Sequence, residues 1–209
     1  MTQSTPLPAG MHLVQADTVP PQAWRNGGGQ TRELLAWPPG QDWQLRISRA
    51  DIAADGPFSA FAGIDRWFAV LEGAGVALHF AQGHTPAGTA TAEPTVTLRQ
   101  GDAPLHFDGG LAPGCTLLGG ATQDLNLMAR AGRSTMLRVQ TNAGWIPSFA
   151  VSGIYTTTTG VLKAGASLMI PLPAHSLLYC TEPHRLPWTF TPDTRDLRAF
   201  WLGYTPDTP

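Results

Sequence analysis

The sequence predicts an all-β protein whose sheets form a sandwich or a barrel. Short runs rich in β-branched, aromatic and aliphatic residues recur along the 209 residues, and turn residues bound each run. The 23 glycines and 19 prolines are spread without a period, which is typical of many tight turns between short strands. No stretch shows a long apolar face of helical period, and the best candidate for a short helix is 124–129. Many short strands at regular spacing favour a sandwich or a barrel.

The strands of the first part are separated by glycine-containing turns. Residues 44–50 alternate apolar and polar side chains, as a half-buried strand does. The apolar runs 66–71 and 76–80 flank a Glu-Gly-Ala-Gly turn, which predicts a β-hairpin. The remaining expected strands are 95–98, 105–107, 115–118, 134–140, 153–158, 167–170, 176–180, 188–191 and 197–202.

Composition and charge exclude several classes of partner. The chain is 43% hydrophobic and 13% charged, so it can bury a core. Its net charge is −2 and Lys163 is its single lysine, so no basic stripe is available for nucleic acid. No apolar run is long enough to span a bilayer, and no secretory signal is visible in 1–10, so a cytoplasmic protein is expected. Cys115 and Cys180 then form a reduced pair, although the sequence leaves a disulfide open.

The most unusual run is WRNGGGQTRE at 24–33. Its three glycines permit positive φ and close backbone approach. A phosphate loop is excluded, because no Lys-Ser/Thr follows the glycines. Two interpretations stay open. The run is either a wide turn entering a strand, or a loop at the mouth of a ligand site, with Asn26 in the loop and Thr31 and Glu33 on one strand face.

Arg46 and Ser48 are candidate ligand-binding residues. If Leu45 and Ile47 pack outward against a second layer, the alternation points Arg46 and Ser48 into the barrel; otherwise Arg46 faces solvent. Periodicity alone does not choose between the two faces. A buried guanidinium needs a partner, which is either an internal carboxylate or an anionic ligand. The planar fork of arginine suits a carboxylate ligand.

Three further polar residues are candidates for the same site. Asp65 and Arg66 are adjacent, so on a strand they lie on opposite faces and need not pair. Asp124 and Asn126 lie on one side if the run around them is extended. Loop structure or an ordinary half-buried strand explains all three equally well.

No metal site is expected. The six histidines are His12, His79, His84, His106, His175 and His184. None of them stands in His-x-His spacing, and 55–78 contains no histidine. Two histidines without a clear third ligand make a poor metal site. No Gly-x-Ser-x-Gly run marks a nucleophile either.

Taken together, these motifs resemble the HutD/Ves family of bicupin proteins, associated with histidine utilisation. The resemblance is carried by seven segments in order. The last third of the chain matches mainly in its succession of short strands bounded by turns. Two positions depart from the family pattern: Ala62 stands where the family tends to have Pro, and Ala131 where it tends to have Arg. The matching segments are WRNGGGQTREL (24–34), WQLRISRA (43–50), DGPFS (55–59), FAGIDR (61–66), LEGAG (71–75), FDG (107–109) and DLNLMAR (124–130).

The resemblance implies two cupin barrels in one chain. We expect an N-terminal half at 11–120 with the main pocket, a C-terminal half at 121–205 and a flexible tail at 1–10. A weak internal echo between 70–105 and 161–171 agrees with two halves. The resemblance further implies a homodimer with a role linked to histidine catabolism. Urocanate and formylglutamate are both carboxylates, and an inward Arg46 would suit either of them as a ligand; no cofactor is expected.

Three functions are compatible with this reading. The first is a metal-free binding protein that regulates histidine utilisation through a carboxylate metabolite. The second is a cupin isomerase or hydrolase that uses Glu33, Asp65 or a histidine as acid or base. The third is a stress-linked interaction protein with a vestigial pocket. The sequence does not settle whether any reaction is catalysed.

Overall fold

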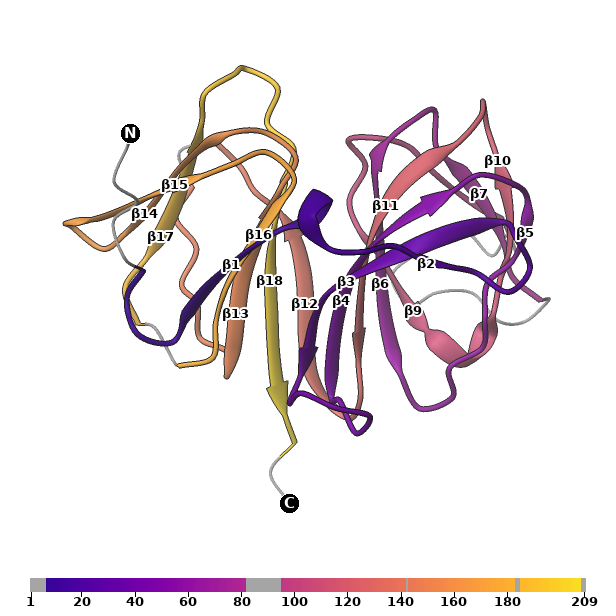
Figure 1. The fold of residues 1–209 in the computed structure, drawn as a ribbon, viewed down its shortest axis with the longest axis horizontal. Helices are drawn as coiled ribbons and strands as arrows, with labels where there is room; N and C mark the ends of the chain where they lie inside the picture. The colour runs from indigo at the N-terminus through magenta and orange to yellow at the C-terminus, as the bar shows by residue number, and fades with distance from the viewer. Residues whose placement is uncertain (1–6, 82–94, 142, 183–184, 208–209) are drawn as a thin grey trace.

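The chain folds into two β-barrels that lie side by side (Figure 1). The computed structural model describes residues 7–81, 95–141, 143–182 and 185–207, and its regular elements in these ranges are strands and two short 3-10 helices. All strand pairings in the four sheets are antiparallel. The prediction of an all-β fold with two barrels is confirmed. No helix in the described ranges has the length and apolar character needed to cross a bilayer.

The first barrel is built from a six-stranded and a four-stranded sheet. The larger sheet has the order β2 (Gln22–Ala23), β3 (Gly29–Trp37), β4 (Leu45–Ile52), β11 (Thr122–Ala129), β6 (Asp65–Glu72) and β9 (Leu105–Asp108). The smaller sheet has the order β5 (Gly56–Pro57), β10 (Gly114–Leu117), β7 (Val76–His79) and β8 (Thr95–Leu98).

The second barrel is built from a five-stranded and a three-stranded sheet. The larger sheet has the order β1 (Met11–Gln15), β16 (Ser176–Cys180), β13 (Val151–Thr156), β18 (Ala199–Pro206) and β12 (Gly132–Arg138). The smaller sheet has the order β15 (Leu168–Leu172), β14 (Gly160–Ala164) and β17 (Trp188–Pro192). The 3-10 helices are η1 (Ala16–Thr18) and η2 (Gly109–Leu111).

Three apolar cores follow from the alternation of side chains along the strands. On β4, Leu45 and Ile47 face the second barrel and join the core between the barrels, while Ile52 lies in the core of the first barrel. On β13, Tyr155 faces the core between the barrels and Ile154 faces the interior of the second barrel. The two large sheets are therefore covered on both faces. Each fully buried leucine or isoleucine between them stabilises the joint by about 1.5–3 kcal/mol.

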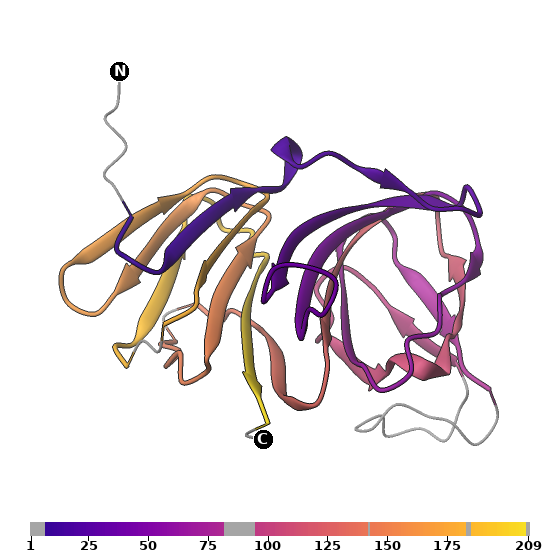
Figure 2. The same cartoon turned by 60° about the horizontal axis from the view of Figure 1, so that its bottom comes forward.

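One strand, β1, departs from the order of the sequence, because it belongs to the second barrel although it precedes the strands of the first. β1 pairs with β16 in the second barrel, and η1 then leads across to β2 and β3 in the first (Figure 2). β11 pairs with β4 and β6 in the first barrel. The structure therefore differs from a simple division into 11–120 and 121–205. Of the expected tail at 1–10, residues 1–6 lie outside the described residues, and Leu7 packs against the second core.

An ion pair fastens η1 to the first barrel. The Arg49 side chain on β4 is buried, and its Nη1 lies 2.8 Å from Oδ1 of Asp17. The side-chain hydrogen bond to Arg49 lowers the pKa of Asp17, with burial opposing it. This ion pair therefore anchors η1, in the segment between β1 and β2, to β4.

Two local predictions are wrong. β6 and β7 do not form a hairpin, because β6 belongs to the six-stranded sheet and β7 to the four-stranded sheet. The turn between them carries the chain from one wall of the barrel to the other. Residues 124–129 are not helical but form most of β11, a central strand between β4 and β6.

The two cysteines are free and lie in different cores. Cys115 belongs to the core of the first barrel and Cys180 to that of the second. The two thiols therefore do not form the disulfide that the sequence left open.

Candidate functional site

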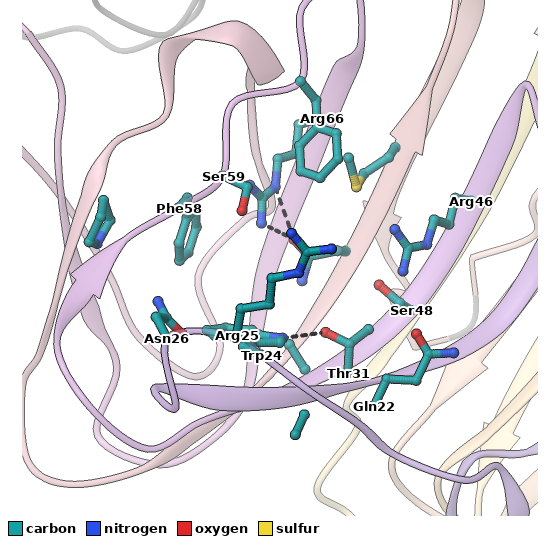
Figure 3. A pocket seen from close by; sticks show the side chains of 16 residues that line it. Gln22, Trp24, Arg25, Asn26, Thr31, Arg46, Ser48, Phe58, Ser59 and Arg66 are labelled. Atoms are coloured by element: carbon teal, nitrogen blue, oxygen red, sulfur yellow. Dashed lines mark hydrogen bonds between the residues drawn. The ribbon is translucent and has the colours of Figure 1, made fainter.

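A cavity of about 420 Å³ opens in the first barrel (Figure 3). We call it the first-barrel cavity. Its walls come from β4, β6 and β11 and from the segments around 22–26 and 57–61. Its volume lies in the range of small-molecule sites. The lining residues are Gln22, Ala23, Trp24, Arg25, Asn26, Thr31, Arg46, Ser48, Ala50, Pro57, Phe58, Ser59, Phe61, Arg66, Asn126 and Met128.

Strand alternation determines which side chains reach the cavity. Arg46, Ser48 and Ala50 of β4 line it, whereas Leu45 and Ile47 pack between the barrels. Of the two faces that the sequence left open for Arg46 and Ser48, the structure shows the one that points into the barrel.

The most deeply buried charge in the cavity is Arg66 on β6. Its Nε and Nη2 both donate to Oδ1 of Asn126, at 3.0 and 2.7 Å. Its guanidinium lies 4.3 Å from the centroid of the Phe58 ring. Among the described residues no carboxylate lies within ion-pairing distance of it. Burial lowers the pKa of Arg66 to about 10, with Asp124 acting in the opposite direction, so the side chain is still a cation at neutral pH.

Arg46 on β4 pairs with an internal carboxylate. Its Nε lies 2.8 Å from Oε2 of Glu33 on β3, and both side chains are partly exposed. This is the first of the two partners that the sequence left open. Glu33 does not itself line the cavity, so it acts there through Arg46. Arg46 also lowers the pKa of Arg66 through charge repulsion, a smaller effect than burial.

The glycine-rich run forms a closed loop at the edge of the cavity. The backbone N of Trp24 donates to O of Gly29 at 2.9 Å, and the indole Nε1 donates to Oγ1 of Thr31 at 2.8 Å. Asn26 accepts at Oδ1 from the backbone N of Gly28. The run is therefore a turn entering β3, and its residues Trp24, Arg25 and Asn26 line the cavity. Arg25 extends from this loop across the cavity, with an exposed side chain (Figure 3).

Asp124 lies on the same face of β11 as Asn126 but does not line the cavity. Its side chain is fully buried, and its Oδ2 accepts a 2.7 Å hydrogen bond from Oγ1 of Thr122. Its Oδ1 has no hydrogen-bond partner among the described residues. Desolvation raises the pKa of Asp124 to about 8, against the opposing effect of the Thr122 hydrogen bond, so this carboxyl is mainly protonated at neutral pH.

Asp65 lies away from the cavity. As expected, it and Arg66 occupy opposite faces of β6, and the structure turns Arg66 inward. Oδ1 of Asp65 lies 3.5 Å from Nε2 of His106, whose ring stacks on Trp67. Asp65 is therefore not brought together with the other candidates.

The described histidines are scattered. His12 stacks on Tyr179, His79 contacts two threonine hydroxyls, and His175 lies 3.5 Å from Glu72. His84 and His184 lie outside the described residues. Within the described ranges, no three His, Cys, Asp or Glu side chains gather as a metal site would require.

Reasoning from the sequence missed the central residue, Arg66. The same alternation that sets Asp65 against Arg66 would have identified it, had the inner face of β6 been known. Trp24, Arg25 and the aromatic wall of Phe58 and Phe61 were also missed as lining residues. They come from loops, where no period indicates the direction of a side chain.

The cavity is electropositive. Three of its lining residues are arginines and none is an aspartate or a glutamate. Aromatic rings and short polar side chains supply the rest of the wall. The chemistry of this lining suits a small anion with a planar or apolar body.

Comparison with known proteins gives consistent matches over most of the chain. The model of the HutD family matches residues 16–193. Protein Ves of Citrobacter koseri is 31% identical over 202 residues, which cover 91% of this chain and 95% of that protein. An uncharacterised 21.2 kDa protein in the hutC 3′ region of Pseudomonas putida is 34% identical over 161 residues, which cover 75% of this chain and 74% of that protein.

Solved structures agree with these matches. A conserved protein of unknown function from Pseudomonas aeruginosa PAO1 has a TM-score of 0.77 and 26% identity, covering 93% of this chain and 98% of that one. HutD from Pseudomonas fluorescens SBW25 has a TM-score of 0.75 and 23% identity, and the match covers 95% of this chain and 100% of that one. A deletion mutant of Bacillus subtilis oxalate decarboxylase has a TM-score of 0.63 and 10% identity, and the match covers 97% of this chain and 79% of that one. The fold is that of a bicupin.

Proposed function

Because the chain belongs to the HutD family, we propose that it is a regulatory protein of histidine utilisation that binds a small carboxylate metabolite in its first-barrel cavity. Binding in this proposal requires no metal, since arginine and amide side chains hold the ligand.

The observation that carries the proposal is the state of Arg66. A fully buried guanidinium with a neutral amide as its hydrogen-bond partner keeps an uncompensated charge. A carboxylate that enters the cavity compensates this charge and accepts hydrogen bonds from the remaining donors of the fork. Trp24, Phe58 and Phe61 supply flat apolar surfaces for the body of the ligand.

The regulatory part of the proposal is supported by the relatives. The Pseudomonas putida relative is described by its place in the hutC 3′ region, and the matching family is HutD. Urocanate and formylglutamate are both carboxylates of histidine breakdown and are the ligands we would test first. A homodimer in the cytoplasm remains part of the proposal.

The two other functions receive less support. Glu33 and Asp65, the acid–base candidates of an enzyme, do not line the cavity, and Glu33 is held by Arg46. A vestigial pocket is expected to be filled by apolar side chains, and this is the state of the second barrel. There Leu162, Trp188 and Trp201 belong to the core. The first barrel keeps its cavity.

Isothermal titration calorimetry with urocanate and formylglutamate tests the proposal. We expect heat with at least one of them, and a loss of about tenfold or more in affinity in Arg66→Met. Methionine fills similar space without a charge, so the variant should stay folded, and its thermal unfolding serves as the control. If neither compound binds, or if Arg66→Met binds as the parent does, the proposed site is wrong.

A further inference from the structure

Positive charge lies at three depths in the first-barrel cavity. Arg66 is buried on β6, the side chain of Arg46 on β4 is 21% exposed, and Arg25 is exposed on the loop before β3. Figure 3 shows the Arg25 side chain reaching across the cavity from its loop. The cavity therefore carries cations from its deepest wall to its mouth.

The charges of this site do not cancel. Glu33 is the one carboxylate of the described residues in an ion pair with any of the three arginines. Three guanidiniums and one carboxylate leave an excess of two positive charges. Asp124, which interacts electrostatically with Arg66, is buried and mainly protonated at neutral pH, because its pKa is raised to about 8 by desolvation. It therefore does not reduce the excess.

Two of the three arginines have no acidic partner. Arg46 is held by Glu33, whereas Arg66 contacts the Asn126 amide, and Arg25 makes no hydrogen bond or ion pair with any described residue. The uncompensated cations are thus the deepest and the most exposed ones. A single carboxylate bound at Arg66 would leave Arg25 without a partner.

We infer that the ligand of the first-barrel cavity is a small dicarboxylate, with one carboxylate at Arg66 and Asn126 and the other at Arg25. This inference rests on the proposed function, which it narrows from carboxylates in general to dianions. The short apolar spacer of such a ligand would lie against Phe58 and Phe61. The cavity of about 420 Å³ accommodates a chain of a few carbons between the two charged ends.

Calorimetric titration with a matched pair of probes at about pH 7 tests the inference. Glutarate carries two carboxylates, and its monoamide, glutaramate, has the same length and shape with one. We expect glutarate to bind about tenfold or more tightly than glutaramate, with a stronger salt dependence. In Arg25→Gln, glutarate affinity should fall to that of glutaramate, while glutaramate affinity stays the same. Arg25→Lys should recover part of the difference.

The controls separate this inference from the function on which it rests. Arg185→Gln removes an exposed arginine outside the cavity and should change neither affinity. Equal binding of both probes would overturn the dicarboxylate inference and leave the carboxylate site standing. Inorganic phosphate binding as tightly as glutarate would also overturn it, because a compact dianion does not join the two ends. If no probe and no candidate metabolite binds, both proposals fail.

Discussion

Arg66 and Asp124 are the two buried ionisable residues that give the interior of the first barrel its polar character. Both are surrounded by strands of the same sheet, and desolvation shifts the pKa of each toward the neutral form. Arg66 nevertheless stays charged at neutral pH and Asp124 stays mainly neutral. Asp124 does not line the cavity, and in its neutral form it does not offset the positive charge of the three lining arginines.

The pH dependence of stability tests the buried state of Asp124. Its pKa is about 8 in the folded chain and 3.8 for the ordinary group, so between these values the folded state binds a proton that the unfolded state lacks. The carboxyl therefore makes the protein less stable as pH rises from about 4 to about 8. Asp124→Asn removes this effect, so the variant should gain a few kcal/mol relative to the parent between about pH 5 and pH 8. Urea unfolding of the parent and the variant at about pH 5 and about pH 8 measures this difference in the free energy of unfolding.

A constant difference between the two proteins across this pH range would contradict a buried, protonated Asp124. Ser48→Ala, which changes a lining residue that does not titrate, provides the reference for pH effects from the rest of the chain.

At the residue scale, the sequence predicts faces better than it predicts sites. The alternation along 44–50 grouped Arg46 with Ser48 on one face of the strand, but it could not tell whether that face points into the barrel, as the structure shows. It also separated Asp65 from Arg66 but could not tell which of them faces inward. That choice depends on the second barrel, because the outer face of β6 packs against it through Ala69 and Leu71.

At the scale of elements, the start of β3 decides the shape of the cavity mouth. A Cβ on Gly29 would lie 2.4 Å from the backbone O of Asp51 and 3.1 Å from the Trp24 ring. The missing side chain lets the loop at Trp24–Gly29 close against β4. This close approach, rather than backbone freedom, is what the third glycine of the run provides.

Substitution of two adjacent glycines tests this element. Gly29→Ala should destabilise the protein by about 1–3 kcal/mol, because the new methyl group collides with backbone that cannot move freely. It should also weaken carboxylate binding by displacing Trp24 and Arg25. Gly28→Ala is the matched control, since its Cβ would meet only the Asn26 side chain at 3.4 Å or more. Chemical denaturation and calorimetry on both variants give the comparison, and equal stability would refute the close contact.

Most strands were predictable because their patterns are local. β8 and β16 match their predicted ranges, and the other predicted strands differ by a few residues at their ends. The hairpin at β6 and β7 was wrong because turn residues mark a reversal of the chain but not the sheet that the next strand joins. The short helix at 124–129 was wrong, because Asp124 and Asn126 alternate with Leu125 and Leu127 as in the extended alternative, and the run is a strand paired on both sides.

At the scale of the molecule, the exchange of β1 makes the second barrel depend on the start of the chain. Met11 is buried in the core of that barrel, and all five residues of β1 pair with β16. Local patterns gave no sign of this, because the pairing joins segments more than 160 residues apart. The two barrels were predictable from family likeness, but their shared construction was not.

Truncation of Met11 tests this dependence. Met11→Ala should lower the free energy of unfolding by about 2–5 kcal/mol, because it opens a cavity in the second core. Leu13→Ala, on the same strand but 37% exposed, should cost clearly less. Hydrogen exchange should show the loss of protection in β16 and β13. Equal effects of the two substitutions would mean that β1 contributes little to the second barrel.

The exchange of β1 also bears on the order in which the protein can be completed during synthesis. The first barrel obtains its last strand when β11 leaves the ribosome, so it can close while the rest of the chain is still being made. β1 is translated before any of it and cannot pair until β16 has emerged. Throughout that interval its backbone donors and acceptors are available to other strands. β1 is thus translated before the other described strands and is among the last to find its partner.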